Sequence, residues 1–280
     1  MTQRTWFITG VNSGFGRAMT EQLLERGDRV AGTVRKRDAV NDLSETYGEN
    51  FWVETLDLTD TADIRPLVDK AFTDLGTVDV IVNNAGYGLF GAAEELTDEQ
   101  VEDALDTNLL GSIQVIRAAL PHLRGQGSGR IIQISTFGGQ AALPGGSMYH
   151  ATKWGIEGFV DAVGQEVAPL GIGVTIVEPG GARTAFRYGS AKLGPAIDAY
   201  AASPASFART MIESGTQLSP GDPVKMAEAI IASADQNPAP KRIVLGTDSF
   251  NMITGALTAR LADVQAQQDS ASATDFPAGE

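Results

Sequence analysis

The chain contains no cysteine, and only two histidines, His122 and His150, occur among its 280 residues. Without cysteine there can be no disulfide, no thiol nucleophile and no Cys-based metal site. The two histidines are too few and too scattered to indicate a metal centre. We therefore expect neither a metal cofactor nor thiol chemistry.

Basic residues are also scarce, since 21 lysines and arginines face 35 aspartates and glutamates, which gives a net charge of −14. This balance argues against nonspecific binding to nucleic acid or to anionic membranes. It leaves room for an anionic cofactor, because a few local cations and backbone N–H groups are enough to bind one.

Long apolar runs are missing as well. No window approaches the ~20 apolar residues that a transmembrane helix needs. The opening residues Met-Thr-Gln-Arg-Thr-Trp run directly into an apolar strand and lack the longer apolar stretch and cleavage site of a secretory signal. We therefore expect a soluble cytoplasmic protein without nucleic-acid or membrane partners.

What the chain does contain is an alternation of short β-rich runs with helical segments, in a composition that is 42% hydrophobic. Most runs are apolar and β-branched, which suits strands that are buried on both faces. The repeated β-α-β pattern predicts an α/β fold of the Rossmann-like, doubly wound type, a seven-stranded parallel sheet with helices on both faces. Asp60 and Thr97 resemble helix N-caps, and Gln100 completes a capping box with Thr97. The expected strands lie near Trp6–Thr9, Arg29–Val34, Phe51–Leu56, Val78–Asn83, Arg130–Ser135, Gly173–Val177 and Arg242–Leu245. The expected helices span about 15–26, 60–75, 97–124, 148–169 and 222–235.

The domain organisation is simple, because no linker divides the chain and no internal repeat is visible. Residues 1–264 are expected to form one domain. Residues 185–221 separate the sixth strand from the next helix and carry several aromatic side chains, so we expect a substrate lid there. Residues 265–280 are polar and small, and we expect a flexible tail.

A glycine-rich turn, Thr9–Gly16, follows the first strand and opens the first helix. The pyrophosphate of a dinucleotide needs a tight turn, close backbone approach and a helix N-terminus with free N–H groups. Gly10, Gly14 and Gly16 meet these needs, although their G-x-x-x-G-x-G spacing matches the general fingerprint loosely. A turn without a ligand is the alternative interpretation. The other expected cofactor contacts in this turn are Asn12, Ser13 and Phe15.

The end of the second strand predicts the choice of cofactor. An acidic residue there would bind the ribose 2′-OH of NAD, whereas an arginine suits the 2′-phosphate of NADP. Arg35 follows the strand directly and is the candidate for that phosphate. Asp38 is a possible NAD-type acid that comes too late, and the basic run 35–37 could also be a solvated charge run. We expect NADP, with NAD the less favoured cofactor.

The ends of the third and fourth strands carry further candidates. Asp57 and Leu58 end the third strand, where a carboxylate could hold the adenine amino group. Asn83, Asn84, Ala85 and Gly86 end the fourth, and their small side chains would let a nucleotide pass over the sheet edge. Each could be only a turn, but loops at the carboxyl ends of parallel strands form the ligand crevice of such folds.

Tyr149 and Lys153 are spaced by one helical turn, so both side chains leave the same face of one helix. An ammonium beside a phenol favours the phenolate, which lowers the tyrosine pKa from its usual ~10. Tyr149 then becomes a candidate proton donor and acceptor. The alternative interpretation is a core aromatic residue beside a solvated helix charge.

Together these motifs resemble the short-chain dehydrogenase/reductase family in its compact branch, over about residues 4–250. The resemblance implies a seven-stranded parallel sheet, a nicotinamide cofactor and reversible carbonyl/alcohol chemistry. It also implies a homodimer or homotetramer that packs through the helices at about 97–124 and 148–169. The residues that carry it are Thr9–Gly16, Asp57, Asn83–Gly86, Asn108, Ser135, Thr136, Tyr149–Lys153, Pro179, Gly180 and Thr184.

The resemblance also assigns roles. Tyr149 would be the general acid/base, while Lys153 would bind the nicotinamide ribose and lower the Tyr149 pKa. Asn108 resembles the residue whose side chain holds a water that links the lysine to solvent. Pro179, Gly180 and Thr184 would border the nicotinamide and its phosphate.

One position departs from the family pattern, which places a serine thirteen residues before the tyrosine. Here that position is Thr136, and Ser135 is one residue away. Neighbouring side chains of a strand point to opposite faces, so only one of them can face the active site. We favour Thr136, whose hydroxyl can donate the same bond to the substrate oxygen; a one-residue shift in the loop 137–148 would restore Ser135.

The sequence thus predicts an NADP(H)-dependent oxidoreductase that interconverts a ketone or aldehyde with an alcohol. Its small-molecule substrate is expected to be lipophilic, because the lid segment is apolar and aromatic. A non-catalytic NADP-binding redox sensor is the alternative from another functional class, but it would usually lack the tyrosine or the lysine. An epimerase or dehydratase of the extended branch is opposed by the glycine spacing.

Overall fold

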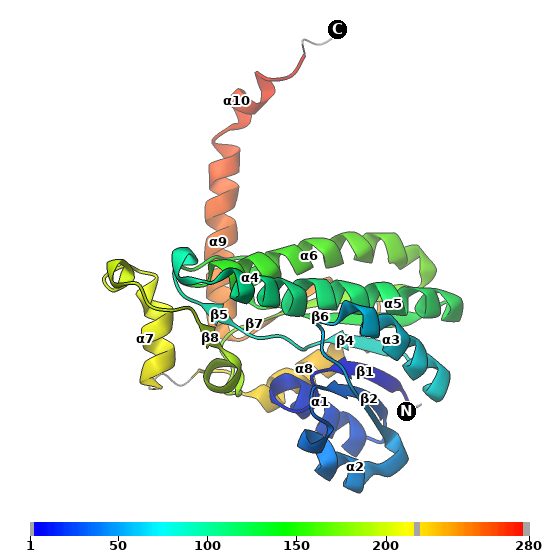
Figure 1. Ribbon diagram of the computed structural model, residues 1–280. Coiled ribbons are helices and arrows are strands. Elements are labelled where there is room, and N and C mark those ends of the chain that lie inside the picture. Colours follow the sequence, from blue (N-terminus) through cyan, green and yellow to red (C-terminus); the bar gives the residue numbers. More distant parts are fainter. Residues whose placement is uncertain (1–2, 216–218, 277–280) are drawn as a thin grey trace.

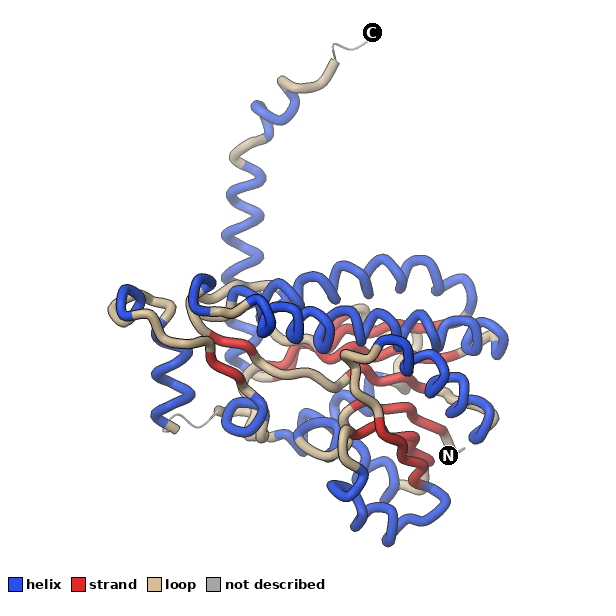
Figure 2. Tube along the Cα trace, viewed as in Figure 1, coloured by secondary structure: helices blue, strands red, loops and turns tan. Residues whose placement is uncertain are grey.

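The computed structural model describes residues 3–215 and 219–276, with the exception of the side chains of Arg187 and Tyr188. A seven-stranded parallel sheet in the order β3-β2-β1-β4-β6-β7-β9 forms the centre of the molecule (Figures 1 and 2). The predicted α/β class, strand number and parallel pairing are therefore confirmed. The strands are β1 (Thr5–Thr9), β2 (Arg29–Val34), β3 (Phe51–Thr55), β4 (Val80–Asn83), β6 (Gly129–Ile134), β7 (Ile172–Pro179) and β9 (Arg242–Leu245).

Helices cover both faces of the sheet, with α3, α5 and α6 on one side and α1 and α8 on the other (Figure 1). The helices are α1 (Gly14–Glu25), α2 (Asn41–Tyr47), α3 (Thr61–Leu75), α4 (Asp98–Leu105), α5 (Gly111–Gln126), α6 (Ser147–Val167), α7 (Ser206–Ser214), α8 (Pro223–Ser233), α9 (Thr247–Gln265) and α10 (Gln268–Ser272).

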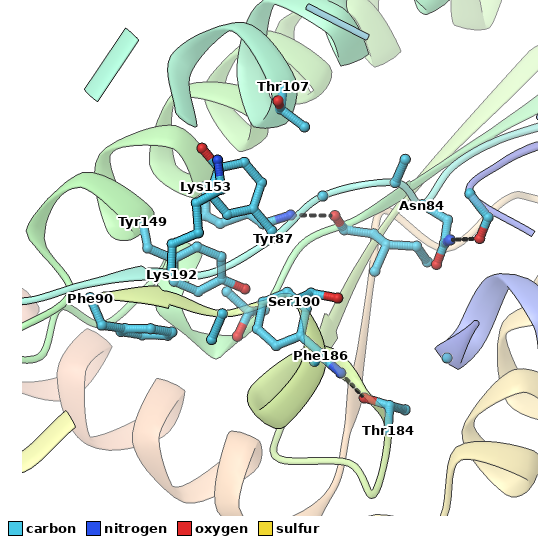
Figure 3. A pocket seen from close by; sticks show the side chains of 18 of the residues that line it. Asn84, Tyr87, Phe90, Thr107, Tyr149, Lys153, Thr184, Phe186, Ser190 and Lys192 are labelled. Atoms are coloured by element: carbon cyan, nitrogen blue, oxygen red, sulfur yellow. Dashed lines mark hydrogen bonds between the residues drawn. The ribbon is translucent and has the colours of Figure 1, made fainter. Parts of the chain in front are cut away.

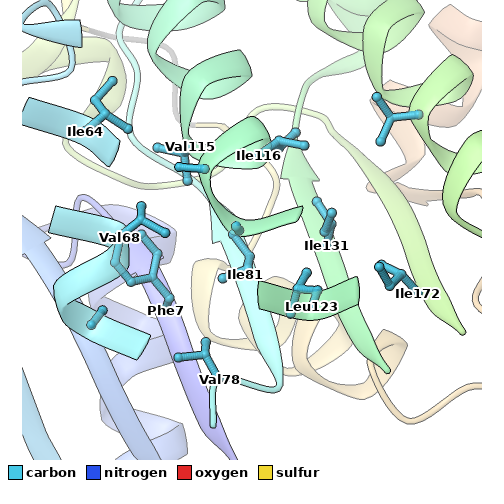
Figure 4. Close-up of a cluster of buried hydrophobic side chains, with 14 of the residues drawn as sticks. Phe7, Ile64, Val68, Val78, Ile81, Val115, Ile116, Leu123, Ile131 and Ile172 are labelled. Carbon is cyan, nitrogen blue, oxygen red and sulfur yellow. The ribbon is translucent and has the colours of Figure 1, made fainter. Parts of the chain in front are cut away.

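Two apolar cores form because each buried strand sends alternate side chains to opposite faces. In β1, Phe7 points into the core beneath α3 and α5, whereas Trp6 and Ile8 point into the core beneath α1 and α8. Figure 4 shows Phe7 and Ile81 packed in the first of these cores. All five residues of β1 are buried, which explains its nearly continuous apolar sequence.

The strand order reverses between β1 and β4, because the chain winds from β1 outward to β3 and then returns to start β4 on the other side. In an open parallel sheet, such a switch point leaves a crevice outside the carboxyl ends of the strands. The glycine-rich turn after β1 and the segment Asn84–Gly86 after β4 both lie at this edge.

One expected helix is divided. The segment predicted as a helix at 97–124 consists of α4 and α5 with a π-helical turn, η4 (Asp106–Leu110), between them. The capping box of Thr97 and Gln100 is present at the start of α4. Asp60 occupies the N-cap position of α3, but its side chain accepts no capping hydrogen bond there.

The segment 185–221 has secondary structure of its own, which the sequence patterns did not predict. It contains η7 (Phe186–Ser190), β8 (Lys192–Leu193), η8 (Asp198–Tyr200) and α7, while residues 216–218 of this predicted lid lie outside the described part of the chain. Strand β8 pairs with β5 (Leu89–Phe90) in a separate two-stranded sheet. An ion pair between the buried Glu95 and the partly buried Arg209 (3.2 Å) joins α7 to the segment after β5.

Helix α9 leaves the body of the molecule and points away from it (Figure 1). The predicted tail, 265–280, includes the short helix α10, all of its described residues are exposed, and residues 277–280 lie outside the described range. Among the helices of the described residues, none is long and apolar enough to cross a membrane.

Candidate active site

A cavity of about 1060 Å³ runs along the switch-point edge of the sheet and continues beneath the lid segment (Figure 3). Its walls come from the loops after β1, β2, β3, β4, β6 and β7, from the start of α6, and from η7 and α7. All of the predicted catalytic and cofactor-binding residues line this cavity except Gly16 and Asn108. The topology therefore gathers residues that are far apart in the sequence.

The glycine-rich turn has room for a ligand because side chains are excluded from it. Gly10 and Gly14 adopt φ values of +75° and +56°, in the left-handed region that favours glycine. A Cβ at Gly16 would lie 2.1 Å from the carbonyl oxygen of Gly10, so no other residue fits there without movement. Across the turn, a Cβ at Gly14 would lie 3.6 Å from the Cβ of Thr184.

Asn84 fastens this turn to the end of β4. Its Nδ2 donates hydrogen bonds to the carbonyl oxygens of Thr9 (2.9 Å) and Gly10 (3.1 Å). The hydroxyl of Thr9 in turn accepts bonds from the backbone N–H groups of Asn84 and Ala85, each at 3.0 Å. The side chain of Asn84 thus supports the turn, while Ala85 and Gly86 leave the adjacent rim of the cavity uncrowded.

Arg35 lies at the carboxyl end of β2, where its exposed side chain lines the cavity. Asp57, after β3, accepts hydrogen bonds from the backbone N–H (3.0 Å) and hydroxyl (2.8 Å) of Thr59. These bonds, with a smaller contribution from the charge of Arg35, hold the pKa of Asp57 below its usual value. Leu58 is buried beside Asp57, so this corner offers a cation, a carboxylate and an apolar surface.

Tyr149 and Lys153 leave the same face of α6, as their spacing predicted, and both are buried. The Lys153 Nζ lies 5.9 Å from the centre of the Tyr149 ring and donates a hydrogen bond to the carbonyl oxygen of Ile134 (3.0 Å). The Tyr149 ring lies between Phe90 and Phe186, with ring centres 5.7 and 5.8 Å away (Figure 3). The phenol is therefore held at an apolar part of the cavity.

The expected direction of the Tyr149 pKa shift is wrong for this structure. Burial raises the pKa of the Tyr149 phenol, and the opposing effect comes from the Thr136 hydroxyl rather than from Lys153. Burial also lowers the pKa of Lys153 to about 8, against the charge of Glu157. The physical reason is that both groups lose water, and desolvation disfavours the phenolate and the ammonium alike.

Thr136 and Ser135 have different surroundings. The Thr136 hydroxyl interacts with Tyr149 and donates to the carbonyl oxygen of Pro179 (3.3 Å). The Ser135 hydroxyl instead donates to the buried carboxylate of Glu157 at 2.5 Å. Both residues follow the end of β6, and of the two hydroxyls it is that of Thr136, the residue that the sequence favoured, that interacts with Tyr149.

Asn108 lies in the π-helical turn η4 and is buried. Its amide forms two hydrogen bonds with the backbone of Tyr87, accepting from the N–H (3.0 Å) and donating to the carbonyl oxygen (2.8 Å). A Cβ at Gly86 would lie 2.9 Å from the Asn108 oxygen and 3.9 Å from the Lys153 Nζ, so the two side chains meet at Gly86. Asn108 therefore fixes the backbone next to the lysine.

The end of β7 closes the crevice opposite β4. Pro179 and Gly180 line the cavity, and the N–H of Gly180 donates to the carbonyl oxygen of Leu245 (2.8 Å). Asp248 of α9 accepts a bond from the N–H of Gly181 at 2.7 Å. Sequence reasoning missed Asp248, because nothing in the local pattern links a helix start at 247 to a strand end at 179.

Several residues of the site gave no sequence signal. Phe90, in the two-stranded sheet, packs beside Tyr149. The Lys192 ammonium lies 4.7 Å from the centre of the Tyr87 ring. His150 is buried and ties down the loop before α6, with Nδ1 3.0 Å from the carbonyl oxygen of Gly138. Within the described residues, no group of three His, Cys, Asp or Glu side chains could hold a metal ion.

The comparisons with known proteins agree with this geometry. A model of the family described as "short chain dehydrogenase" matches residues 4–192. This chain belongs to the short-chain dehydrogenase/reductase family. The family assignment confirms the resemblance drawn from the motifs, and the protein is accordingly an oxidoreductase.

Individual relatives extend over nearly the whole chain. Oxidoreductase BOA17 of Botryotinia fuckeliana is 35% identical over 248 residues, which cover 88% of this chain and 90% of that protein. The crystal structure of a short-chain dehydrogenase from Streptomyces avermitilis is 37% identical, has a TM-score of 0.91 and covers 98% of this chain and 99% of its own. A serine dehydrogenase complexed with NADP+ is 25% identical, with a TM-score of 0.71 over 86% of this chain and 93% of its own.

Proposed function

We propose that this short-chain dehydrogenase is an NADP(H)-dependent oxidoreductase that interconverts a ketone or aldehyde with an alcohol. The observation that carries the proposal is the convergence of Tyr149, Lys153 and Thr136 at one end of a cavity whose other end is a glycine-lined turn. A proton-transfer group and a dinucleotide cradle in one cavity are the two parts that hydride chemistry needs.

The cradle fits a dinucleotide by its shape. Gly10, Gly14 and Gly16 keep the turn clear of side chains, and the N-terminus of α1 opens directly behind it. Backbone N–H groups and the helix dipole at such a terminus favour a pyrophosphate. Asn12, Ser13 and Phe15 complete the turn that borders the cavity.

The choice of NADP rests on Arg35. Its guanidinium is exposed at the end of β2, where the 2′-phosphate of an adenosine ribose would lie in this fold. Two charge-assisted hydrogen bonds from one guanidinium suit a phosphate. The NADP+ complex of the related serine dehydrogenase supports the same choice.

The catalytic roles follow from the positions of the side chains. A bound nicotinamide supplies or accepts the hydride. Tyr149 donates the proton to the carbonyl oxygen during reduction, and Thr136 hydrogen-bonds the same oxygen. The Tyr149 phenol is protonated at neutral pH, as a proton donor must be, and burial raises its pKa further.

Lys153 acts from the same helix face. Its ammonium binds the nicotinamide ribose and stabilises the phenolate that Tyr149 leaves behind, while Ile134 holds the ammonium in place through its carbonyl oxygen. Asn108 sets the backbone of Tyr87 beside the lysine, and a water at this place would pass protons between Lys153 and solvent. Thr184 faces Gly14 across the cradle, where it would contact a phosphate of the cofactor.

The substrate is proposed to be lipophilic. The cavity around Tyr149 is walled by aromatic and apolar side chains, including Phe90, Phe186, Phe207 and Met211. Such walls bury apolar substituents of the carbonyl carbon and exclude water from the reacting atoms. Residues 185–221 would thereby act as the substrate lid.

A homodimer or homotetramer is proposed to form through α4, α5 and α6. Leu110 and Trp154 support this, because these large apolar side chains are about two-fifths exposed at the surface of that helical layer. Assembly through the outer face of these helices would bury Leu110 and Trp154 and leave the cavity unobstructed.

Replacing Tyr149 tests the proposed function. Tyr149→Phe removes only the phenolic oxygen, so NADPH should bind with unchanged affinity while turnover with a carbonyl panel, followed by absorbance at 340 nm, falls at least 100-fold. Tyr47→Phe is the control, because Tyr47 ends α2 away from the cavity. Substantial turnover in Tyr149→Phe would contradict the assigned role, and NADPH binding without any carbonyl turnover in the wild type would favour the redox-sensing alternative.

A further inference from the structure

A buried pair of carboxyl groups lies behind the catalytic side chains and has no part in the chemistry described so far. Glu157 of α6 and Glu178 of β7 are 2% and 1% exposed. Arg242 of β9 lies 3.2 Å from Glu178 and 3.6 Å from Glu157. A buried carboxylate is costly unless it is paired and hydrogen-bonded, so its presence calls for a physical reason.

Glu157 is connected to both sides of the catalytic centre. It follows Lys153 by one helical turn on the same face of α6. Its Oε1 accepts the hydrogen bond from Ser135, the residue before Thr136, and its Oε2 accepts one from Gln140. A Cβ at Gly139 would lie 1.9 Å from Oε1, so the backbone is packed closely around the carboxylate.

We propose that Glu157, supported by Arg242 and Glu178, is a positioning residue that keeps Lys153 charged and directs Thr136 towards the substrate. This inference rests on the proposed function, because it acts through the lysine and the threonine. The bond to Glu157 holds the Ser135 hydroxyl, while the hydroxyl of the next residue, Thr136, interacts with Tyr149.

The Lys153 ammonium is buried and has lost most of its contact with water. Burial alone drives the pKa of Lys153 down, and the charge of Glu157 opposes that shift. Glu157 therefore increases the fraction of Lys153 that carries a proton at neutral and mildly alkaline pH. Neutral glutamine at position 157 would remove this support, and the ammonium would be lost at a lower pH.

Glu178 keeps the pair from carrying two uncompensated charges. Burial and the charge of Glu157 raise the pKa of Glu178 to about 7, so Glu178 binds a proton more readily than an exposed glutamate does. Other ionisable groups surround the pair. They are Lys153 and Asp161 on α6, Arg242 on β9, Arg260 on α9 and His150 near the start of α6. Arg260 donates a hydrogen bond to the Gln140 carbonyl oxygen.

The test compares Glu157→Gln with Asp161→Asn, which also removes a carboxylate of α6 near Arg242 but lies one turn further from Lys153. NADPH affinity and carbonyl turnover are measured between pH 6 and 10. For Glu157→Gln, the alkaline loss of NADPH affinity should move to lower pH by about one unit, the size of shift that a neighbouring charge produces. For Asp161→Asn, the profile should match the wild type.

Two further variants keep the inference testable if Glu157→Gln does not fold. Glu157→Asp retains the charge and should retain the wild-type pH profile, even if a shorter side chain lowers the melting temperature. Ser135→Ala removes the hydrogen bond to Glu157 but leaves the charge of Glu157 in place, so the pH profile should be preserved. The variant should lower kcat, because the backbone that carries Thr136 is then held less firmly.

The outcomes separate this inference from the proposed function. A Glu157→Gln variant that folds and shows the wild-type pH profile and kcat would refute the positioning role. If the wild type turns over no carbonyl compound, the proposed function fails, but the pH dependence of NADPH affinity still reports on Glu157 and Lys153.

Discussion

The glycine at position 16 offers the sharpest test of the cofactor cradle, because the structure gives the size of the perturbation directly. A Cβ there would lie 2.1 Å from the Gly10 carbonyl oxygen and 2.5 Å from the Asn84 Nδ2. Contacts below 3.0 Å require movement, and both partners belong to the hydrogen-bonded tie between the turn and β4. Gly16→Ala must therefore displace the turn itself.

Two opposing effects decide the result. Alanine improves the propensity of α1 by about 1 kcal/mol relative to glycine. The overlap with the backbone of Gly10 costs typically 1–3 kcal/mol or more, as overpacking of a close-packed interior does. The overlap with backbone atoms at 2.1 Å places the cost towards the upper end of that range, so Gly16→Ala should lower the free energy of unfolding by up to about 2 kcal/mol.

The assay is thermal unfolding together with NADPH titration. Moving the turn also moves the N–H groups that would bind the pyrophosphate, so we expect the NADPH affinity of Gly16→Ala to fall at least tenfold. Gly255→Ala is the control, because a Cβ at this position of α9 meets no atom within 4 Å. Wild-type stability and affinity in Gly16→Ala would refute the argument that the cradle depends on this close approach.

Two further changes test the other ends of the cavity. Arg35→Asp should shift the ratio of kcat/KM values from NADPH towards NADH by at least tenfold, because an aspartate repels the 2′-phosphate and accepts a hydrogen bond from a 2′-OH. The ratio is measured in parallel assays with both cofactors, and an unchanged ratio would place the phosphate contact elsewhere. Thr136→Ala should lower kcat by ten- to a hundredfold, whereas Thr136→Ser should keep most of the activity, because only the hydroxyl donates a hydrogen bond to the substrate oxygen. Equal activity of the two variants in the 340 nm assay would argue against that hydrogen bond.

Local patterns predicted much of this molecule. The alternation of buried strands with helices gave the parallel sheet, because burial on both faces leaves a plain apolar signature. The spacing of Tyr149 and Lys153 placed them on one face of α6, because helical periodicity depends only on the local backbone. Gly10 and Gly14 marked the turn, since positive φ values favour glycine.

What the sequence could not supply depends on contacts between distant segments. The pKa of Tyr149 rises because Phe90 and Phe186 bury its ring, and both come from elements of other parts of the chain. The separate environments of Ser135 and Thr136 depend on Glu157, a partner 22 residues away from the serine. The π-helical turn in the segment predicted as one helix also left no periodic signal.

The separation of the cradle from Arg35 has an evolutionary consequence. The turn would grip the pyrophosphate with main-chain groups, which are the same whether the ribose carries a phosphate or a hydroxyl. If Arg35 binds the 2′-phosphate as proposed, discrimination between the two dinucleotides depends on one exposed position at the end of β2. One substitution at this position would then change whether the enzyme exchanges hydride with the NADP or the NAD of the cell. The buried residues around Tyr149 would stay the same.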